Sequence, residues 1–234
     1  MHMPPASASR PARPDHRRLL QLRARKLLRS ARTPRYWRAL SHGVFPSIEF
    51  EGLPFQTPDL VIDVGANHGQ FALFASGRFP RAPIVCFEPV VPSWKVYPVV
   101  PRADFRPYAC GASYGRVTIH VAPDDVLSSI AAPAPGSHTQ EVIQVRLDSQ
   151  DLPPFRSALL KIDVEGYEAE VIRGASGILD RVAQVLVECP DEDAQREVAA
   201  LLAPAGLVPR FEHHEWQGKT DVLFARRNPT GPAE

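Results

Sequence analysis

Apolar runs of five to seven residues alternate with amphipathic stretches along most of the chain after residue 59. The runs have the β-branched and aromatic character of buried strands, and they span residues 60–64, 83–88, 104–110, 158–164, 182–188 and 221–225. Stretches with helical periodicity span residues 68–77, 166–175 and 191–203. This alternation predicts a parallel sheet covered by helices on both faces. Two more strand-like segments, 116–121 and 141–147, lie outside the repeating units.

The first 40 residues follow a different pattern. Residues 1–14 are rich in Pro, Ala and Ser, which is typical of disordered segments. A basic amphipathic helix is predicted from Asp15, which can cap it, to Pro34, which can stop it. Arginines fill the positions between its apolar residues, which recur at helical spacing at Leu20, Ala24, Leu27, Leu28 and Ala31.

The net charge of +1 hides a strong asymmetry. Residues 1–40 hold eleven Lys or Arg and one acid, whereas the other 194 residues hold sixteen Lys or Arg and twenty-five acids. We therefore divide the chain into a basic helical arm (1–40), an acidic globular domain (41–226) and a flexible tail (227–234).

A basic amphipathic helix contacts an anionic membrane, binds nucleic acid or packs on its own domain. Nucleic acid is disfavoured here because the acidic domain would repel phosphates. Peripheral membrane contact through residues 15–38 stays open, although no aromatic residue precedes Tyr36 and Trp37 on the apolar face.

The cysteines and the lack of targeting patterns bear on the compartment. Cys86, Cys110 and Cys189 are an odd number without metal-ligand spacing, which indicates reduced thiols. The sequence contains neither a signal-peptide pattern nor an apolar run long enough to span a membrane. We expect a soluble, cytoplasmic protein, with attachment to a membrane surface as the alternative.

The first predicted strand ends in a glycine-rich turn, "VIDVGANHGQ" (61–70). In doubly wound sheets, ligands bind beyond the carboxyl ends of the strands. Gly65 and Gly69 would let the backbone approach a ligand closely, and Asp63 and Asn67 would supply polar atoms. The spacing is neither G-x-G-x-x-G nor a phosphate-binding loop with Lys-Ser/Thr, which disfavours pyrophosphate.

The second predicted strand ends at Glu88, about 20 residues after the glycines. A carboxylate at this position suits the two hydroxyls of a ribose. Together with the glycines, Glu88 favours an adenosine-type ligand.

The later strands also end in acids, within "LLKIDVEGYEAEVIRGA" (159–175) and at Glu188. Helix N-termini favour negative charge, so Glu168 is either a helix-capping residue or a residue of the site, and the sequence leaves both interpretations open. Asp163 follows an apolar, buried strand and should emerge at the ligand cleft, with Glu165 beside it.

These segments resemble the FkbM-type family of S-adenosylmethionine-dependent methyltransferases. The resemblance rests on "VIDVGANHGQF", "FEP" and "LLKIDVEGYEAEVIRGA", with "GVFPSIE", "LSSI" and "VRLD" in support, and it covers roughly residues 43–225. It does not include residues 1–40, so it carries no information about the arm.

The resemblance implies a class I methyltransferase fold: a Rossmann-like three-layer α/β sandwich whose seven-stranded, mostly parallel sheet has an antiparallel closing strand. "GLVPRF" (206–211) and "DVLFA" (221–225) suit the closing pair. The resemblance also implies a site for S-adenosylmethionine, whose product is S-adenosylhomocysteine. The implied cofactor-binding residues are Asp63, Gly65, Ala66, Asn67, Gly69, Glu88, Pro89, Ala109, Cys110, Gly111 and Asp163.

A hydroxyl acceptor must lose its proton, and we hypothesise that Asp163 is the general base or belongs to its network with Glu188 and Glu165. In a second hypothesis, Asp163 and Glu188 hold Mg²⁺, which lowers the pKa of the acceptor. His213 and His214 are further candidate bases, of which at most one can face the cleft.

The resemblance suggests O-methylation of a sugar, a glycolipid or a polyketide-like small molecule. Residues 124–130, with the proline-rich stretch 130–140, are predicted to form the acceptor-binding loop. Two alternatives remain: a nicotinamide-dependent oxidoreductase, and a non-catalytic cofactor-binding protein anchored by its basic arm.

Overall fold

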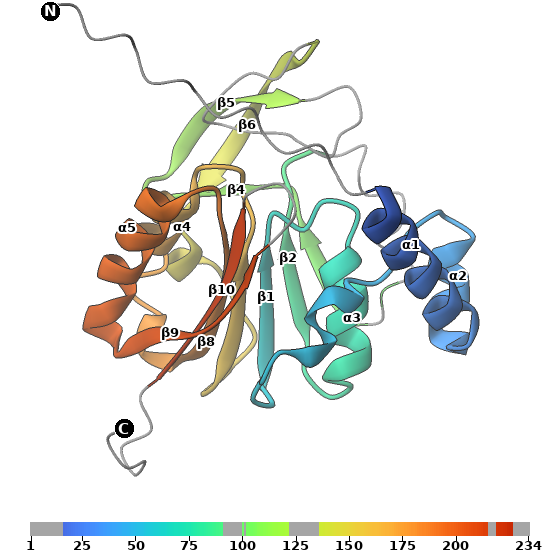
Figure 1. The fold of residues 1–234 in the computed structure, drawn as a ribbon. Coiled ribbons are helices and arrows are strands. Elements are labelled where there is room, and N and C mark those ends of the chain that lie inside the picture. The colour runs from blue at the N-terminus through green and yellow to red at the C-terminus, as the bar shows by residue number, and fades with distance from the viewer. Residues whose placement is uncertain (1–15, 91–99, 101, 122–135, 215–218, 227–234) are drawn as a thin grey trace, which may run out of the picture.

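The computed structural model describes residues 16–90, 100, 102–121, 136–214 and 219–226 of the chain. Its centre is a seven-stranded sheet with the strand order β3-β2-β1-β7-β8-β10-β9 (Figure 1). The strands are β1 (Leu60–Val64), β2 (Ile84–Phe87), β3 (Ala103–Arg106), β7 (Ala158–Ile162), β8 (Val182–Cys189), β9 (Leu207–His214) and β10 (Thr220–Arg226). All neighbours pair in parallel except β10, which is antiparallel to both β8 and β9. The expected sheet, including its antiparallel closing strand, is confirmed.

The chain builds this sheet outward from β1 in both directions. It first adds β2 and β3 on one side of β1, and it then returns to add β7 and β8 on the other side. The order therefore reverses between β1 and β7, which is where doubly wound sheets bind their ligands. The strand ends that carry polar residues in the sequence meet at this point.

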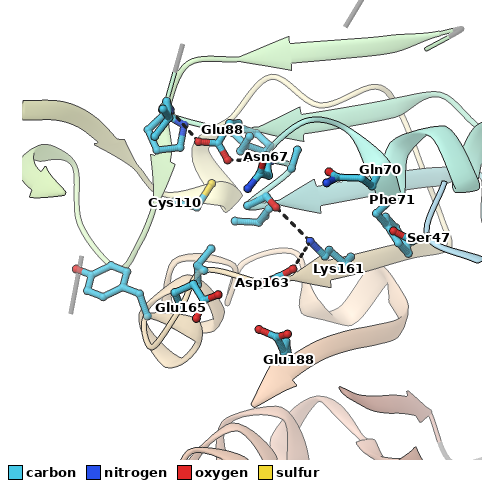
Figure 2. Close-up of a pocket in the computed structure, with 18 of the residues that line it drawn as sticks. Ser47, Asn67, Gln70, Phe71, Glu88, Cys110, Lys161, Asp163, Glu165 and Glu188 are labelled. Atoms are coloured by element: carbon cyan, nitrogen blue, oxygen red, sulfur yellow. Dashed lines mark hydrogen bonds and ion pairs between the residues drawn. The ribbon is translucent and has the colours of Figure 1, made fainter. Parts of the chain in front are cut away.

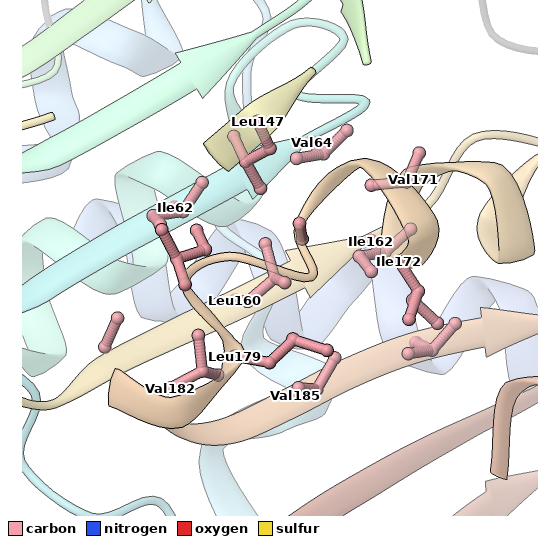
Figure 3. Packing of buried hydrophobic residues seen from close by; sticks show 14 of the residues in the cluster. Ile62, Val64, Leu147, Leu160, Ile162, Val171, Ile172, Leu179, Val182 and Val185 are labelled. Atoms are coloured by element: carbon pink, nitrogen blue, oxygen red, sulfur yellow. The ribbon is translucent and has the colours of Figure 1, made fainter. Parts of the chain in front are cut away.

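Helices cover both faces of the sheet because successive strand residues point to opposite sides. On one face, α4 (Glu168–Gly174) and α5 (Glu192–Leu202) pack against a cluster that includes Ile62, Leu160 and Val185 (Figures 1 and 3). On the other face, α3 (Gln70–Arg78) packs against the intervening side chains, such as Val61 and Leu159. Full burial of each such side chain contributes about 1.5–3 kcal/mol, so both faces help to hold the strand ends in place.

A second, three-stranded sheet lies above the first (Figure 1). Its order is β4-β6-β5, with β4 (Ala109–Cys110), β5 (Gly115–Val121) and β6 (His138–Val145). The two extra strand-like segments of the sequence are thus confirmed as β5 and β6. The prediction of a single strand over residues 104–110 is wrong: Pro107, which has no N–H to donate, separates β3 in one sheet from β4 in the other.

The predicted basic helix is present as α1 (His16–Ala31). It is followed by the 3₁₀ turn η1 (Pro34–Tyr36), the short helix α2 (Trp37–Leu40) and η2 (Ile48–Gly52); the other 3₁₀ turns are η4 (Leu147–Ser149), η5 (Leu179–Arg181) and η6 (Ala203–Ala205). Two ion pairs join α1 to η2, so this helix packs on the domain. No helix in the described part of the chain has the length and apolar character needed to cross a bilayer.

Some of the predictions fall outside the described residues. They concern the disorder of residues 1–14, the tail 227–234 and most of the proposed acceptor loop, residues 124–135. The division of the chain into arm, domain and tail stays a prediction.

Candidate functional site

A cavity of about 310 Å³ opens where β1, β2, β7 and β8 end, and the loop before β10 completes it (Figure 2). Its wall contains polar groups from all of these elements. They include Asn67 after β1, Glu88 after β2, Asp163 after β7 and Glu188 in β8. A cavity of this size at the switch point of a doubly wound sheet is the expected place for a small ligand.

The turn after β1 depends on backbone conformations that glycine favours. Gly65 has a φ of +75°, and a Cβ on this residue would lie only 1.7 Å from the carbonyl oxygen of Asp163. The N–H groups of Gly65 and Ala66 donate to the carbonyl of Phe87 at 3.0 and 3.1 Å. A side chain at position 65 would therefore force apart the β1 and β7 loops that form the cavity floor.

Glu88 lies buried at one side of the cavity. Its Oε2 accepts a hydrogen bond of 2.9 Å from the N–H of Asn67, and its Oε1 accepts one of 2.8 Å from the N–H of Val90. Burial raises the pKa of Glu88 to about 7, although the two N–H donors oppose this rise. The carboxylate is thus fixed in orientation, next to the glycine turn, and faces the cavity (Figure 2).

Lys161 places a buried positive charge in the floor. Its Nζ donates to the carbonyl of Gly65 at 3.1 Å and lies 3.0 Å from Oδ2 of Asp163 and 3.5 Å from Oδ1 of Asp63. Burial lowers the pKa of Lys161, but Asp163 and Asp63 outweigh this effect and hold the pKa above its ordinary value. The ammonium group therefore ties the β1 turn to the end of β7.

Three carboxyl groups gather on the opposite side of the cavity from Glu88. Asp163, Glu165 and Glu188 each bring one oxygen within 4.8 Å of the others. The Nζ of Lys219, just before β10, lies 2.7 Å from Glu165 and 2.7 Å from Glu188. A protein ammonium group thus bridges two of the three acids.

The acids in this cluster have different pKa values. Burial raises the pKa of Asp163, but Lys161 and Lys219 outweigh it and hold that pKa below its ordinary value. Burial and then the charge of Asp163 raise the pKa of Glu188 to about 8, against the opposing contact with Lys219. Near neutral pH, an ionised Asp163 therefore lies beside a Glu188 that holds a proton for much of the time.

Most of the predicted site residues line the cavity. The predicted catalytic acids Asp163, Glu165 and Glu188 do so, as do the predicted cofactor-binding residues Gly65, Ala66, Asn67, Glu88, Pro89, Ala109 and Cys110. Their contacts with a cofactor stay predictions.

Three predicted cofactor-binding residues do not reach the cavity. Asp63 is fully buried beneath it, so direct cofactor contact by Asp63 is not supported. Gly69, with a φ of +81°, is the N-cap residue of α3 and does not line the cavity. A Cβ on Gly111 would meet the side chain of Gln144 at 2.6 Å, which makes this glycine a packing residue.

The structure also places the residues that were left open. Glu168 is buried, and its Oε1 accepts from the N–H of Gly166 at 2.8 Å, as expected of a capping residue. His213 does not line the cavity, but its Nδ1 lies 3.6 Å from Oδ2 of Asp221, which does. The side chain of His214 lies outside the described residues.

Sequence reasoning missed both lysines. Lys161 could have been predicted from the sequence, because it interrupts an apolar strand two residues before Asp163 and so lies on the same face of the sheet as Asp163. Lys219 could not have been predicted, because it lies in a polar loop that is remote in sequence from the acids that it contacts. Ser47 and Glu49 line the cavity from the segment before β1. In sequence they belong to "GVFPSIE", which supported only the family resemblance, and no role in the site was predicted for them.

Comparisons with known proteins agree with this geometry. Residues 63–217 match the family described as "Methyltransferase FkbM domain". The chain is 29% identical over 219 residues to the 31-O-demethyl-FK506 methyltransferase FkbM of Streptomyces tacrolimicus, covering 75% of this chain and 84% of that protein. It is 27% identical over 158 residues to the hexuronic acid methyltransferase AglP of Haloferax volcanii, covering 64% of this chain and 63% of the relative.

Among solved structures, a methyltransferase FkbM from Methylobacillus flagellatus KT has a similar fold. The TM-score is 0.52 at 14% sequence identity. The match covers 77% of this chain but only 46% of the other, so this chain spans about half of that longer protein.

Proposed function

The chain belongs to the FkbM family of methyltransferases, and on that premise we propose that it is an S-adenosylmethionine-dependent O-methyltransferase. The acceptor is a hydroxyl group of a sugar, a glycolipid or a polyketide-like small molecule. The observation that carries the proposal is one cavity with a fixed carboxylate, Glu88, on one side of a glycine turn and a cluster of acids on the other.

The residues of this cavity fit the cofactor. The carboxylate of Glu88 faces the cavity, and the N–H groups of Asn67 and Val90 hold it in an orientation suited to accept hydrogen bonds from ribose hydroxyls. Ala109 and Cys110 offer an apolar wall for the adenine. When bound, the cofactor supplies an electrophilic methyl group on a positively charged sulfur.

The charge balance of the floor suits a cationic ligand. Four acids, Asp63, Asp163, Glu165 and Glu188, lie within one network with two lysines, Lys161 and Lys219. Negative charge is in excess only when more than two of these acids are ionised, which ionisation of Glu188 towards pH 8 promotes. Such an excess favours a sulfonium and disfavours the phosphates of a nicotinamide dinucleotide.

In this proposal, the Asp163–Glu188 pair takes up the proton that the acceptor hydroxyl loses. The side chain of Asp163 is 36% exposed, whereas that of Glu188 is only 15% exposed, so Asp163 is the better placed to receive the proton. Glu188 is the stronger base of the two, with a pKa of about 8. The pair accepts a proton more readily once Glu188 is ionised, so methyl transfer should accelerate as the pH rises towards 8.

A metal ion is not needed in this proposal. The ammonium group of Lys219 already occupies the position between Glu165 and Glu188 where a cation would bind. Exhaustive treatment with EDTA should therefore leave turnover unchanged, and a loss that Mg²⁺ restores would favour the metal hypothesis.

The acceptor class rests on the relatives' names. One relative is named as a hexuronic acid methyltransferase and the other as a 31-O-demethyl-FK506 methyltransferase. The sugar and polyketide-like acceptor classes of the proposal are taken from these two names. Neither name assigns an acceptor to this chain.

The experiment is to incubate the protein with methyl-deuterated S-adenosylmethionine and a panel of hydroxylated sugars, glycolipids and macrolides, and to follow labelled products by mass spectrometry. A labelled methyl ether is expected. Asp163→Asn should slow its formation by about 10²-fold or more without loss of cofactor binding. Label on nitrogen or carbon, or full turnover by Asp163→Asn, would contradict the proposal.

A further inference from the structure

Helix α1 packs on the domain through its polar side. Lys26 forms an ion pair of 3.0 Å with Glu49, and Ser30, one turn later on the same side of the helix, is completely buried. Arg29 adds an ion pair of 3.0 Å with Glu51. These contacts fix which side of α1 faces the protein.

The apolar side of α1 consequently faces solvent. Leu27 and Leu28 are 52% and 56% exposed, and Ala24 and Ala31 are exposed beside them. At 100° per residue, Ala24, Leu28 and Ala31 lie on the side of the helix away from Lys26 and Ser30, and Leu27 lies at the edge of that side. An amphipathic helix in a water-soluble domain normally buries this side.

Trp37 extends the apolar side beyond the end of α1. Its indole N–H donates to the carbonyl of Ala31 at 2.8 Å, which places the ring beside the last turn of the helix. The side chain is 58% exposed. We call the group formed by Ala24, Leu27, Leu28, Ala31 and Trp37 the outer face of α1.

Uncompensated positive charge surrounds the outer face. Arg25, Arg32 and Arg38 are exposed, and within the described part of the chain no carboxylate pairs with any of them. They belong to the first 40 residues, whose net charge is +10 against −9 for the rest of the chain. The outer face therefore combines apolar contact area with a strong local attraction for anions.

We propose that the outer face of α1 docks on the surface of an anionic lipid membrane. Leu and Trp side chains flanked by arginines are what a helix needs to lie in the headgroup region. Each Arg near an anionic surface strengthens binding about fivefold. A nucleic acid would engage the arginines but leave Leu27 and Leu28 without an apolar partner, so the exposed leucines favour the membrane.

The docking surface lies close to the cavity. Lys26, on the inner side of the same helix, lines the cavity wall, so the membrane would lie about one helix diameter, roughly 10 Å, from that wall. The docking itself does not depend on which acceptor the enzyme uses.

The first test is co-sedimentation of the full chain with phosphatidylglycerol-containing vesicles and with pure phosphatidylcholine vesicles. Binding to the anionic vesicles is expected, and added salt should weaken it. Leu27→Glu with Leu28→Glu should reduce binding about tenfold or more, and Arg25→Gln with Arg32→Gln should also reduce it. The matched control is Ile143→Glu, which adds a charge at a 42% exposed aliphatic residue of β6 and should leave binding unchanged.

A second measurement locates the contact. Brominated lipids should quench the fluorescence of the wild type more than that of Trp37→Phe, because Trp37 would lie among the acyl chains. Three outcomes would overturn the proposal: no binding to anionic vesicles, equal binding by the doubly substituted leucine variant, or binding to an RNA homopolymer without binding to vesicles. Melting curves confirm that each variant is folded.

Discussion

Two lysines lie among the acids around the cavity. Lys161 is buried between Asp63 and Asp163, and Lys219 bridges Glu165 and Glu188. Their ammonium groups offset part of the carboxylate charge, which allows several acids to lie close together.

Replacing Lys219 by Met should remove part of this compensating charge. The pKa of Glu188 should rise further, because burial and Asp163 would act without the opposing lysine. We expect turnover to fall by about 10²-fold, measured by transfer of labelled methyl groups, with S-adenosylhomocysteine binding within a few fold of wild type.

Lys219→Arg is the matched control, because it keeps a positive charge between the two acids. It should retain more activity than Lys219→Met at every pH. Equal turnover by the Met variant and the wild type would show that the lysine has no part in the reaction.

Glu88 should make the stability of the ligand-free protein depend on pH. Its pKa rises from an ordinary 4.5 to about 7 on folding, chiefly because of burial. Between these values the native state binds the proton more tightly than the unfolded state, so the free energy of unfolding should fall as the pH rises.

Melting temperatures between pH 4.5 and 7.5 measure this effect. Glu88→Gln should flatten the decline, because the amide cannot ionise. Parallel curves for the two proteins would mean that Glu88 does not titrate differently in the native state.

The turn after β1 is the element on which the cavity depends most. Gly65→Ala places a methyl group against the carbonyl of Asp163 and forces alanine into a positive φ. We expect a loss of about 3 kcal/mol in the free energy of unfolding, measured by urea titration.

Gly52→Ala is the control for this substitution. Gly52 has open space around its Cβ position and no positive φ, so alanine should be tolerated there. If the two variants were equally stable, the close approach of the β1 and β7 loops would be in doubt.

Elements with a single apolar pattern were predicted well. β1 matches its predicted range, and β2, β7 and β8 differ from theirs by at most two residues at an end, because each is an apolar run that the sheet buries on both faces. The segment 104–110 failed because strand propensity carries no information about which of two sheets will pair with it. The orientation of α1 could not be predicted either, since its apolar side faces away from the core.

The whole molecule brings together groups that the sequence keeps apart. The acids at the ends of β7 and β8 could be predicted to meet because adjacent parallel strands end at one edge. Lys219 joins them only because β10 runs antiparallel beside β8, so its first residues lie at the same edge. The local sequence pattern therefore identified the carboxylates, whereas Lys219, which contacts two of them, could be identified only from the three-dimensional structure.

Positive and negative charge are concentrated in different parts of the chain: residues 1–40 are basic and the rest is acidic. The acidic domain contains the cavity, while Arg25 and Arg32 of α1 are exposed on the outside of the molecule. Under the two proposals, one chain binds a sulfonium in its interior and an anionic membrane at its exterior.

The central claim is that the cavity binds the nucleoside of S-adenosylmethionine through Glu88. Calorimetry with S-adenosylhomocysteine and with NAD, on the wild type and on Glu88→Gln, tests it directly. The account predicts that only S-adenosylhomocysteine binds, and that Glu88→Gln weakens it at least tenfold. Binding of NAD alone, or undiminished binding of S-adenosylhomocysteine by Glu88→Gln, would contradict it.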